Sequence, residues 1–174
     1  REPFRVLEEA GLVQLEKNRG VFVREVSLHE ALEIFDMRAM MEAHVGATLA
    51  AQASAEQLQT LQSLIDSMEQ AVVQQDHAQY YLRNVEFHET MVSFVGNQKL
   101  TSIYRRLTRE LGLFRRRNLT QQSELLASVQ EHRHILAAIG SRDPAKASDA
   151  LRQHVLLSRE RTERNHPQTL NPTT

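Results

Sequence analysis

The sequence predicts an all-α protein, an antiparallel bundle of about six helices, preceded by a short N-terminal segment of mixed structure. Two observations predict this class. Gly and Pro are scarce, with six and four among 174 residues, while helix-favouring residues such as Ala, Leu, Gln, Glu and Arg are abundant. From residue 25 to about residue 165, hydrophobic side chains recur with the 3.6-residue period of an amphipathic helix.

The N-terminal segment, residues 1–24, has a different pattern. A helix is predicted over residues 1–10, because Pro3 fits only near a helix start and Gly11 fits the position after a helix end. Two short strands are predicted at residues 12–15 and 20–23, joined by a polar turn. A helix, a strand, a basic turn and a strand form the last part of a winged helix-turn-helix. The other helices of such a domain are expected upstream.

Six helices are expected in the rest of the chain. The first runs from its cap Ser27 to about residue 52, and the second starts at the cap Ser54. The third spans about residues 76–95, and the fifth spans about residues 122–139. The sixth opens at Asp143-Pro144 and ends near residue 164. The side chains expected to face the core from the fourth helix are Leu100, Ile103, Leu107, Leu111 and Phe114. Short connections make the bundle antiparallel.

Composition excludes several classes of protein. The absence of Cys excludes disulfides, thiolate metal sites and Cys nucleophiles. No signal peptide and no apolar run of bilayer length is found, so a cytoplasmic location is expected. The net charge of −1 argues against a whole-chain polyanion binder. The arginines between residues 105 and 117 are interpreted as parts of solvated helix faces, in preference to a patch that binds nucleic acid.

Four polar side chains interrupt the apolar stripes, and three of them are histidines on three different helices. Asn84 and His88 share a face of the third helix, His132 lies on the stripe of the fifth, and His154 lies on that of the sixth. One inward His is usually a core residue with a hydrogen-bond partner. Three inward histidines can all find their partner in one shared divalent cation. A ligand set of imidazoles with an Asn oxygen suits Zn, Ni or Mn. The alternative is that each histidine makes an ordinary hydrogen bond in the core. The spacing of the residues does not decide between the metal site and this alternative.

Arg38 is a further interruption and lies on an inward stripe of the first bundle helix. An inward Arg requires a carboxylate or phosphate partner. Two interpretations have equal weight from the sequence: an internal ion pair with Glu42 on the same helix, or a role in binding a ligand.

These motifs resemble the GntR superfamily of bacterial transcription regulators, and within it the FadR subfamily with its FCD (FadR C-terminal) effector domain. The resemblance covers nearly the whole chain. REPFRVLEEAGLV at 1–13 and NRGVFV at 18–23 are similar to the recognition helix and the wing, followed by EVSLHEALEIFDMRAMMEA at 25–43. The three His motifs of the family are matched by NVEFHETMVSFVGNQKL at 84–100, EHRHILAAI at 131–139 and LRQHVLLSRER at 151–161.

The resemblance implies a division of the chain into three parts. Residues 1–24 would be the C-terminal part of a winged helix-turn-helix, residues 25–165 an FCD-type ligand-binding domain, and residues 166–174 a disordered tail. The whole would be a ligand-responsive transcription regulator that binds two-fold operators as a homodimer. In the N-terminal part, Arg1 and Arg5 would face the major groove, and Lys17 and Arg19 would lie near phosphates.

For the helical domain, the resemblance implies that His88, His132 and His154 are metal ligands. Asn84 occupies the position of the family's oxygen ligand, where many members have Asp. Arg38 matches an Arg that points into the effector pocket. Members that carry these histidines usually respond to small carboxylates, so a small carboxylate effector is expected here.

The alternatives are a metal-dependent hydrolase and a metal-free helical interaction module. A hydrolase needs a general base beside the metal-bound water. His88-Glu89 begins an HExxH motif, but residue 92 is Val, and Glu131 is expected to point to a different face from His132. We therefore expect no enzymatic activity.

Overall fold

The computed structural model describes residues 2–9, 12–16, 20–115 and 122–166. Its elements are α1 (Glu2–Glu9), β1 (Val13–Glu16), β2 (Gly20–Val23), α2 (Leu28–Gln52), α3 (Ala55–Val73), α4 (His77–Phe94), α5 (Gln98–Arg115), α6 (Gln122–Gly140) and α7 (Pro144–Asn165). The all-α class and the six bundle helices are confirmed. Within the described ranges, no helix is both long enough and apolar enough to cross a membrane.

The predicted caps begin the helices where the sequence places them. Ser27 and Ser54 each accept a hydrogen bond from the backbone N–H three residues on, and Glu30 and Gln57 complete two capping boxes. Asp143 accepts from two backbone N–H groups of α7, with Pro144 as its first residue. These local contacts fix where α2, α3 and α7 enter the bundle.

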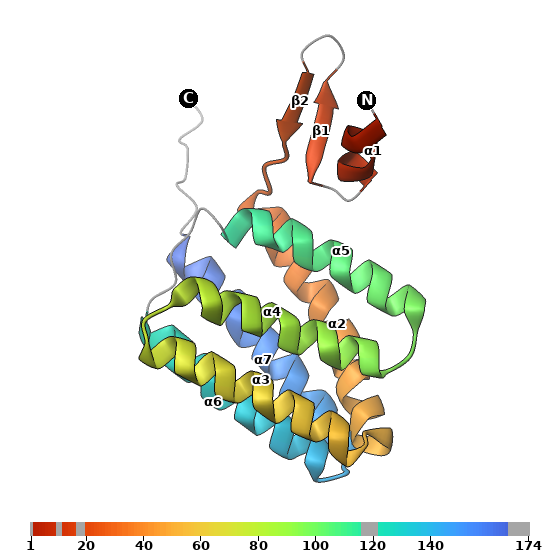
Figure 1. The fold of residues 1–174 in the computed structure, drawn as a ribbon, viewed down its shortest axis with the longest axis vertical. Coiled ribbons are helices and arrows are strands. Elements are labelled where there is room, and N and C mark those ends of the chain that lie inside the picture. Colours follow the sequence, from red (N-terminus) through yellow and green to blue (C-terminus); the bar gives the residue numbers. More distant parts are fainter. Residues whose placement is uncertain (1, 10–11, 17–19, 116–121, 167–174) are drawn as a thin grey trace, which may run out of the picture.

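Helices α2 and α7 pack together, with α4 and α5 in front of them, while α3 packs against α4 and α6 (Figure 1). Helices α2 and α7 approach closely at Gly46. A Cβ at this position would lie 2.5 Å from the carbonyl oxygen of Ala147 and 2.7 Å from Leu151 Cδ1. Gly46 is therefore required by the contact between the helices rather than by its backbone conformation.

The hydrophobic core has two parts, one shared by α2, α3, α4, α6 and α7 and one between α2, α5 and α7. Of the positions predicted to face inward from α5, Leu111 and Phe114 are buried and Leu100 and Leu107 are partly buried, but Ile103 is 52% exposed. Tyr104 takes the inward position on α5 instead and is fully buried. The prediction for Ile103 was wrong because an amphipathic pattern leaves a choice between adjacent residues at the edge of the stripe.

The N-terminal segment forms α1 and an antiparallel hairpin in which Val13 pairs with Val23. The first strand begins one residue later than predicted, because the N–H of Leu12 donates to the Leu7 carbonyl in the turn after α1 (2.9 Å). Three of the four residues predicted to contact DNA, Arg1, Lys17 and Arg19, lie outside the described residues, as does the side chain of Arg5, which is on α1.

Arg24, the residue after β2, joins the hairpin to the bundle. Its guanidinium pairs with Glu30 on α2 at 2.5 Å and with Glu110 on α5 at 3.0 Å. At the other end of the chain, residues 167–174 lie outside the described residues. His166, predicted to begin the tail, still packs against Phe114 with ring centroids 5.1 Å apart.

Candidate metal centre

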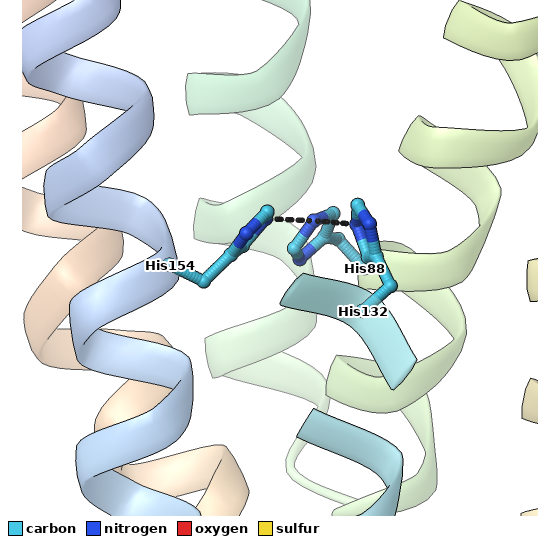
Figure 2. A group of neighbouring side chains, drawn as sticks. All are labelled: His88, His132 and His154. Carbon is cyan, nitrogen blue, oxygen red and sulfur yellow. Dashed lines mark hydrogen bonds between the residues drawn. The ribbon is translucent and has the colours of Figure 1, made fainter. Parts of the chain in front are cut away.

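Three histidines from three helices meet inside the bundle (Figure 2). His88 comes from α4, His132 from α6 and His154 from α7, and each is at most 5% exposed. The Nε2 atom of His88 lies 3.2 Å from the Nε2 of His132 and 3.2 Å from that of His154. The structure thus brings together the three residues that the sequence predicted as ligands.

The other ring nitrogen of each histidine faces a hydrogen-bond acceptor. Nδ1 of His88 is 2.7 Å from a carboxylate oxygen of Glu42, and Nδ1 of His154 is 2.7 Å from one of Glu131. Nδ1 of His132 is 2.6 Å from the backbone oxygen of Ser128. Each neutral ring therefore carries its proton on Nδ1 and presents the lone pair of Nε2 to the other two.

Three lone pairs that face one another repel, unless a cation lies between them, and here two of the three Nε2–Nε2 separations are 3.2 Å. Zn–N bonds of about 2.05 Å in tetrahedral geometry would separate two ligand nitrogens by about 3.3 Å. The two observed separations are close to this value. The donor set and its spacing therefore fit a divalent metal ion, with each Nδ1–H held by an outer partner as in metal-ligating histidines.

Burial keeps His88 and His132 in the neutral form that binds metal. Burial, with a smaller contribution from the positive charge of Arg38, lowers the pKa of His88 to about 4 although Glu42 opposes the shift. Burial and the neighbouring histidines lower the pKa of His132 well below its ordinary value of 6.5. Both rings are therefore neutral at physiological pH, so no proton has to leave them for a metal to bind.

Asn84 lies one turn before His88 on α4 and lines the same cavity as His88 and His154. Its side-chain oxygen is buried and has no hydrogen-bond partner among the described residues. A buried amide oxygen without a partner is costly, so it indicates a missing donor or cation. This observation supports the predicted role of Asn84 as an oxygen ligand.

Glu42, Arg38 and Tyr104 form a buried network behind His88. Arg38 donates to Glu42 Oε1 at 2.8 Å through Nη2, and the Tyr104 hydroxyl donates to the same oxygen at 2.7 Å. Burial raises the pKa of Glu42, but its contacts with His88 and with the Arg38 guanidinium lower it further, so it lies well below 4.5. The ion pair suggested by the sequence is confirmed, and Arg38 also lines the cavity.

A second carboxylate supports the triad from the side of α7. Glu131 accepts from His154 and, through both of its oxygens, from Arg161 at 2.6 and 2.9 Å. Burial raises the pKa of Glu131, but the hydrogen bonds from Arg161 and His154 lower it to about 2. Glu131 was predicted to point to a different face from His132, and its contact with His154 was not predicted. Arg161, two turns after His154 on the same face of α7, was the available signal.

A cavity of about 650 Å³ adjoins the triad, and His88, His154, Asn84 and Arg38 line it together. Its volume is in the range of small-molecule binding sites. Apolar walls come from Leu125 and Phe114, and further polar groups come from α4, α6 and α7: His77, Glu124, Ser128, Ser158, Thr162 and Asn165. A ligand in this cavity would reach the metal centre and Arg38 at the same time.

Known proteins resemble this chain along most of its length. The family model described as the FCD domain matches residues 33–157. The HTH-type transcriptional repressor GlaR of Escherichia coli (strain K12) is 30% identical over 170 residues, which cover 90% of this chain and 74% of the relative. The uncharacterized HTH-type transcriptional regulator YdhC of Bacillus subtilis (strain 168) is 26% identical over 157 residues, 90% of this chain and 68% of the relative.

The fold is that of solved regulators. The structure of E. coli McbR/YncC superposes with a TM-score of 0.84 at 19% identity, over 94% of this chain and 83% of that one. That likeness concerns the fold alone, whereas the family match covers most of the helical domain with all four predicted metal ligands. The relatives are regulators and not enzymes, as expected for this chain. The chain belongs to the GntR family of ligand-responsive, DNA-binding transcription regulators, in the branch that carries an FCD domain.

Proposed function

We propose that His88, His132 and His154, assisted by Asn84, hold one divalent metal ion, and that a small carboxylate bound to it is the effector of this regulator. The observation that carries the proposal is the convergence of three Nε2 lone pairs, with those of His132 and His154 each 3.2 Å from that of His88, while every Nδ1 is already engaged. Zn, Ni and Mn all bind imidazole nitrogen and amide oxygen, and the three imidazoles favour Zn or Ni among them.

The bound metal would supply open coordination positions facing the cavity, where a carboxylate can replace water. The protein's own residues would then orient the carboxylate. Arg38 holds a positive charge in the cavity wall, fixed in place by Glu42 and Tyr104. Leu125 and Phe114 provide an apolar wall for the rest of the ligand, and Ser158 provides a hydroxyl.

Binding of the effector would change the affinity for operator DNA by shifting the population of two arrangements of the bundle. The usual coupling between linked sites is about 1–3 kcal/mol. We propose that the regulator acts in the cytoplasm as a homodimer on a two-fold operator. Arg1 and Arg5 would face the major groove, and Lys17 and Arg19 the phosphates.

Metal content tests the first half of the proposal. Protein purified without a His tag should contain one equivalent of metal by elemental analysis, and His132→Ala should contain none. His134→Ala is the matched control, because His134 lies on the same helix but is exposed. Equal metal content in wild type and His132→Ala would show that the triad is not the metal site, and would favour a metal-free helical module.

Thermal melting tests the second half. Metal-loaded protein should be stabilised by the correct carboxylate in a panel, and chelator-treated protein should not, because a ligand that binds the folded state raises its melting temperature. The carboxylate found in this way should then change the midpoint of an operator gel shift at fixed salt. A ligand that stabilises both forms equally would place the effector away from the metal.

A further inference from the structure

We propose that the metal and a carboxylate each strengthen the binding of the other at this site, because Asn84 leaves the buried centre with an uncompensated positive charge. The inference rests on the proposed function and specifies how the two ligands depend on each other. Its starting point is the set of formal charges around the triad.

The charged side chains in contact with the triad cancel. Glu42 contacts His88, and Glu131 contacts His154, so two negative charges lie next to the rings. Arg38 pairs with Glu42 at 2.8 Å, and Arg161 pairs with Glu131 at 2.6 Å. The ligand set of three neutral imidazoles and the Asn84 amide adds no charge. A divalent ion would therefore bring two positive charges into a region with no net charge.

Neither carboxylate beside the triad is available to compensate the ion. Both oxygens of Glu42 are engaged, one by Arg38 and Tyr104 and the other by His88. Both oxygens of Glu131 are engaged by Arg161, and one of them also accepts from His154. Turning either carboxylate toward a metal would leave an arginine without its partner.

Glu124, a carboxylate that lines the cavity, is too distant to serve. It precedes His132 by eight positions on α6, which corresponds to about 12 Å along a helix at 1.5 Å per residue. It also accepts hydrogen bonds at 3.1 Å from the Asn165 amide. The compensating charge must then come from outside the protein.

Burial makes this requirement strong. His132 is fully buried, and His88 and His154 are 2% and 5% exposed. Uncompensated charge in such a place is costly, and a paired anion removes most of the cost. A carboxylate supplies both a negative charge and a donor oxygen. The Nη1 group of Arg38, which has no hydrogen-bond partner among the described residues, can donate to its second oxygen.

Linkage then makes the dependence mutual: the carboxylate raises the affinity for the metal by the same factor as the metal raises the affinity for the carboxylate. An Asp at residue 84 would supply one negative charge itself and weaken this dependence. Asn84 is therefore the residue that makes the site respond to an anion when it binds metal.

Competition with a chromophoric chelator tests the inference, with Co²⁺ as the metal and acetate as the probe anion at fixed ionic strength. For the wild-type chain, we expect saturating acetate to tighten Co²⁺ binding about tenfold or more and to change the Co²⁺ absorption spectrum. Asn84→Asp should bind Co²⁺ more tightly without acetate, and acetate should change its affinity less than about threefold.

Two further variants separate charge from other effects. Asn84→Ala removes the donor oxygen but stays neutral, so its Co²⁺ affinity should be lower and should still rise with acetate. Asn97→Asp makes the same charge change outside the cavity, in the cap of α5, and should behave as wild type. Melting of the metal-free variants checks that each is folded.

The outcomes distinguish the two proposals. Tight Co²⁺ binding by the wild type with no effect of acetate would overturn the pairing of metal and carboxylate and leave the metal site standing. An acetate effect of equal size in Asn84→Asp would also overturn it. No Co²⁺ binding with or without acetate would overturn both the pairing and the proposed metal site.

Discussion

Replacing Glu42 by Gln removes a negative charge from the centre of the domain without changing the shape of the side chain. Glu42 is fully buried, and its two oxygens accept hydrogen bonds from Arg38, Tyr104 and His88. An amide has one acceptor oxygen and one NH₂ donor. In either orientation the NH₂ group faces a donor, either the Arg38 and Tyr104 pair or the Nδ1–H of His88.

The loss of stability follows from Arg38, which is 5% exposed and would have no anionic partner. Removing one member of a buried ion pair costs about 3–5 kcal/mol. At about 2–4 °C per kcal/mol for a chain of this size, the melting temperature of the metal-free protein should fall by about 6–20 °C.

The same substitution should weaken metal binding. The less costly orientation keeps the amide oxygen at Arg38 and turns the NH₂ group toward His88. His88 must then accept through Nδ1 and carry its proton on Nε2, where the metal requires a lone pair. Loss of such an outer partner typically lowers metal affinity about 10–100-fold.

Calorimetric melting of chelator-treated protein, followed by zinc competition, measures both effects. Glu33→Gln is the matched control: Glu33 is on the same helix with its side chain 65% exposed, so its loss should change stability by less than about 0.5 kcal/mol. If Glu42→Gln melts at the same temperature as Glu33→Gln, the reasoning about the buried pair is refuted.

Three further predictions concern stability. Gly46→Ala should destabilise the protein by about 1–3 kcal/mol in urea unfolding, since its Cβ would lie 2.5 Å from the Ala147 carbonyl oxygen; Gly140→Ala, with open space around it, should not. Ser54→Ala should cost about 1 kcal/mol in the same assay through loss of a helix cap, and Ser54→Asp should restore most of it. Removing the metal by dialysis against a chelator should lower the free energy of unfolding. The expected loss is about 2.7 kcal/mol relative to protein at a free metal concentration of about a hundred times the dissociation constant. An unchanged melting temperature would argue against a bound metal.

Local patterns could be predicted from the sequence because their partners are a few residues apart. The caps Ser27 and Ser54 and the Arg38–Glu42 pair all join residues three or four apart in one helix. The three histidines were predicted because each interrupts an apolar stripe and the motifs match a known family. None of these predictions required knowledge of how the helices cross.

Contacts between helices could not be predicted in the same way. Tyr104 on α5 reaches Glu42 on α2 across 62 positions of sequence, and Glu131 meets Arg161 across 30. Periodicity identifies a buried face but not the residue it meets on another helix. Ile103 shows the related error, because one residue at the edge of a stripe was placed inward and its neighbour was not.

One turn of α5 connects the hairpin to the cavity, because Arg24 after the hairpin pairs with Glu110 at one end of this turn and Phe114 lies at the other. Glu110 pairs with Arg24 at 3.0 Å, and Phe114, four residues further along α5, lines the cavity. A shift of α5 as the cavity fills would therefore change the distance between Glu110 and Arg24 directly. The pair is only partly buried, with side chains 30% and 11% exposed, so dissolved salt reaches it. Its contribution is screened over a Debye length of about 8 Å at physiological ionic strength. The effect of an effector on operator binding should thus be larger in dilute buffer than at the salt concentration of a cell.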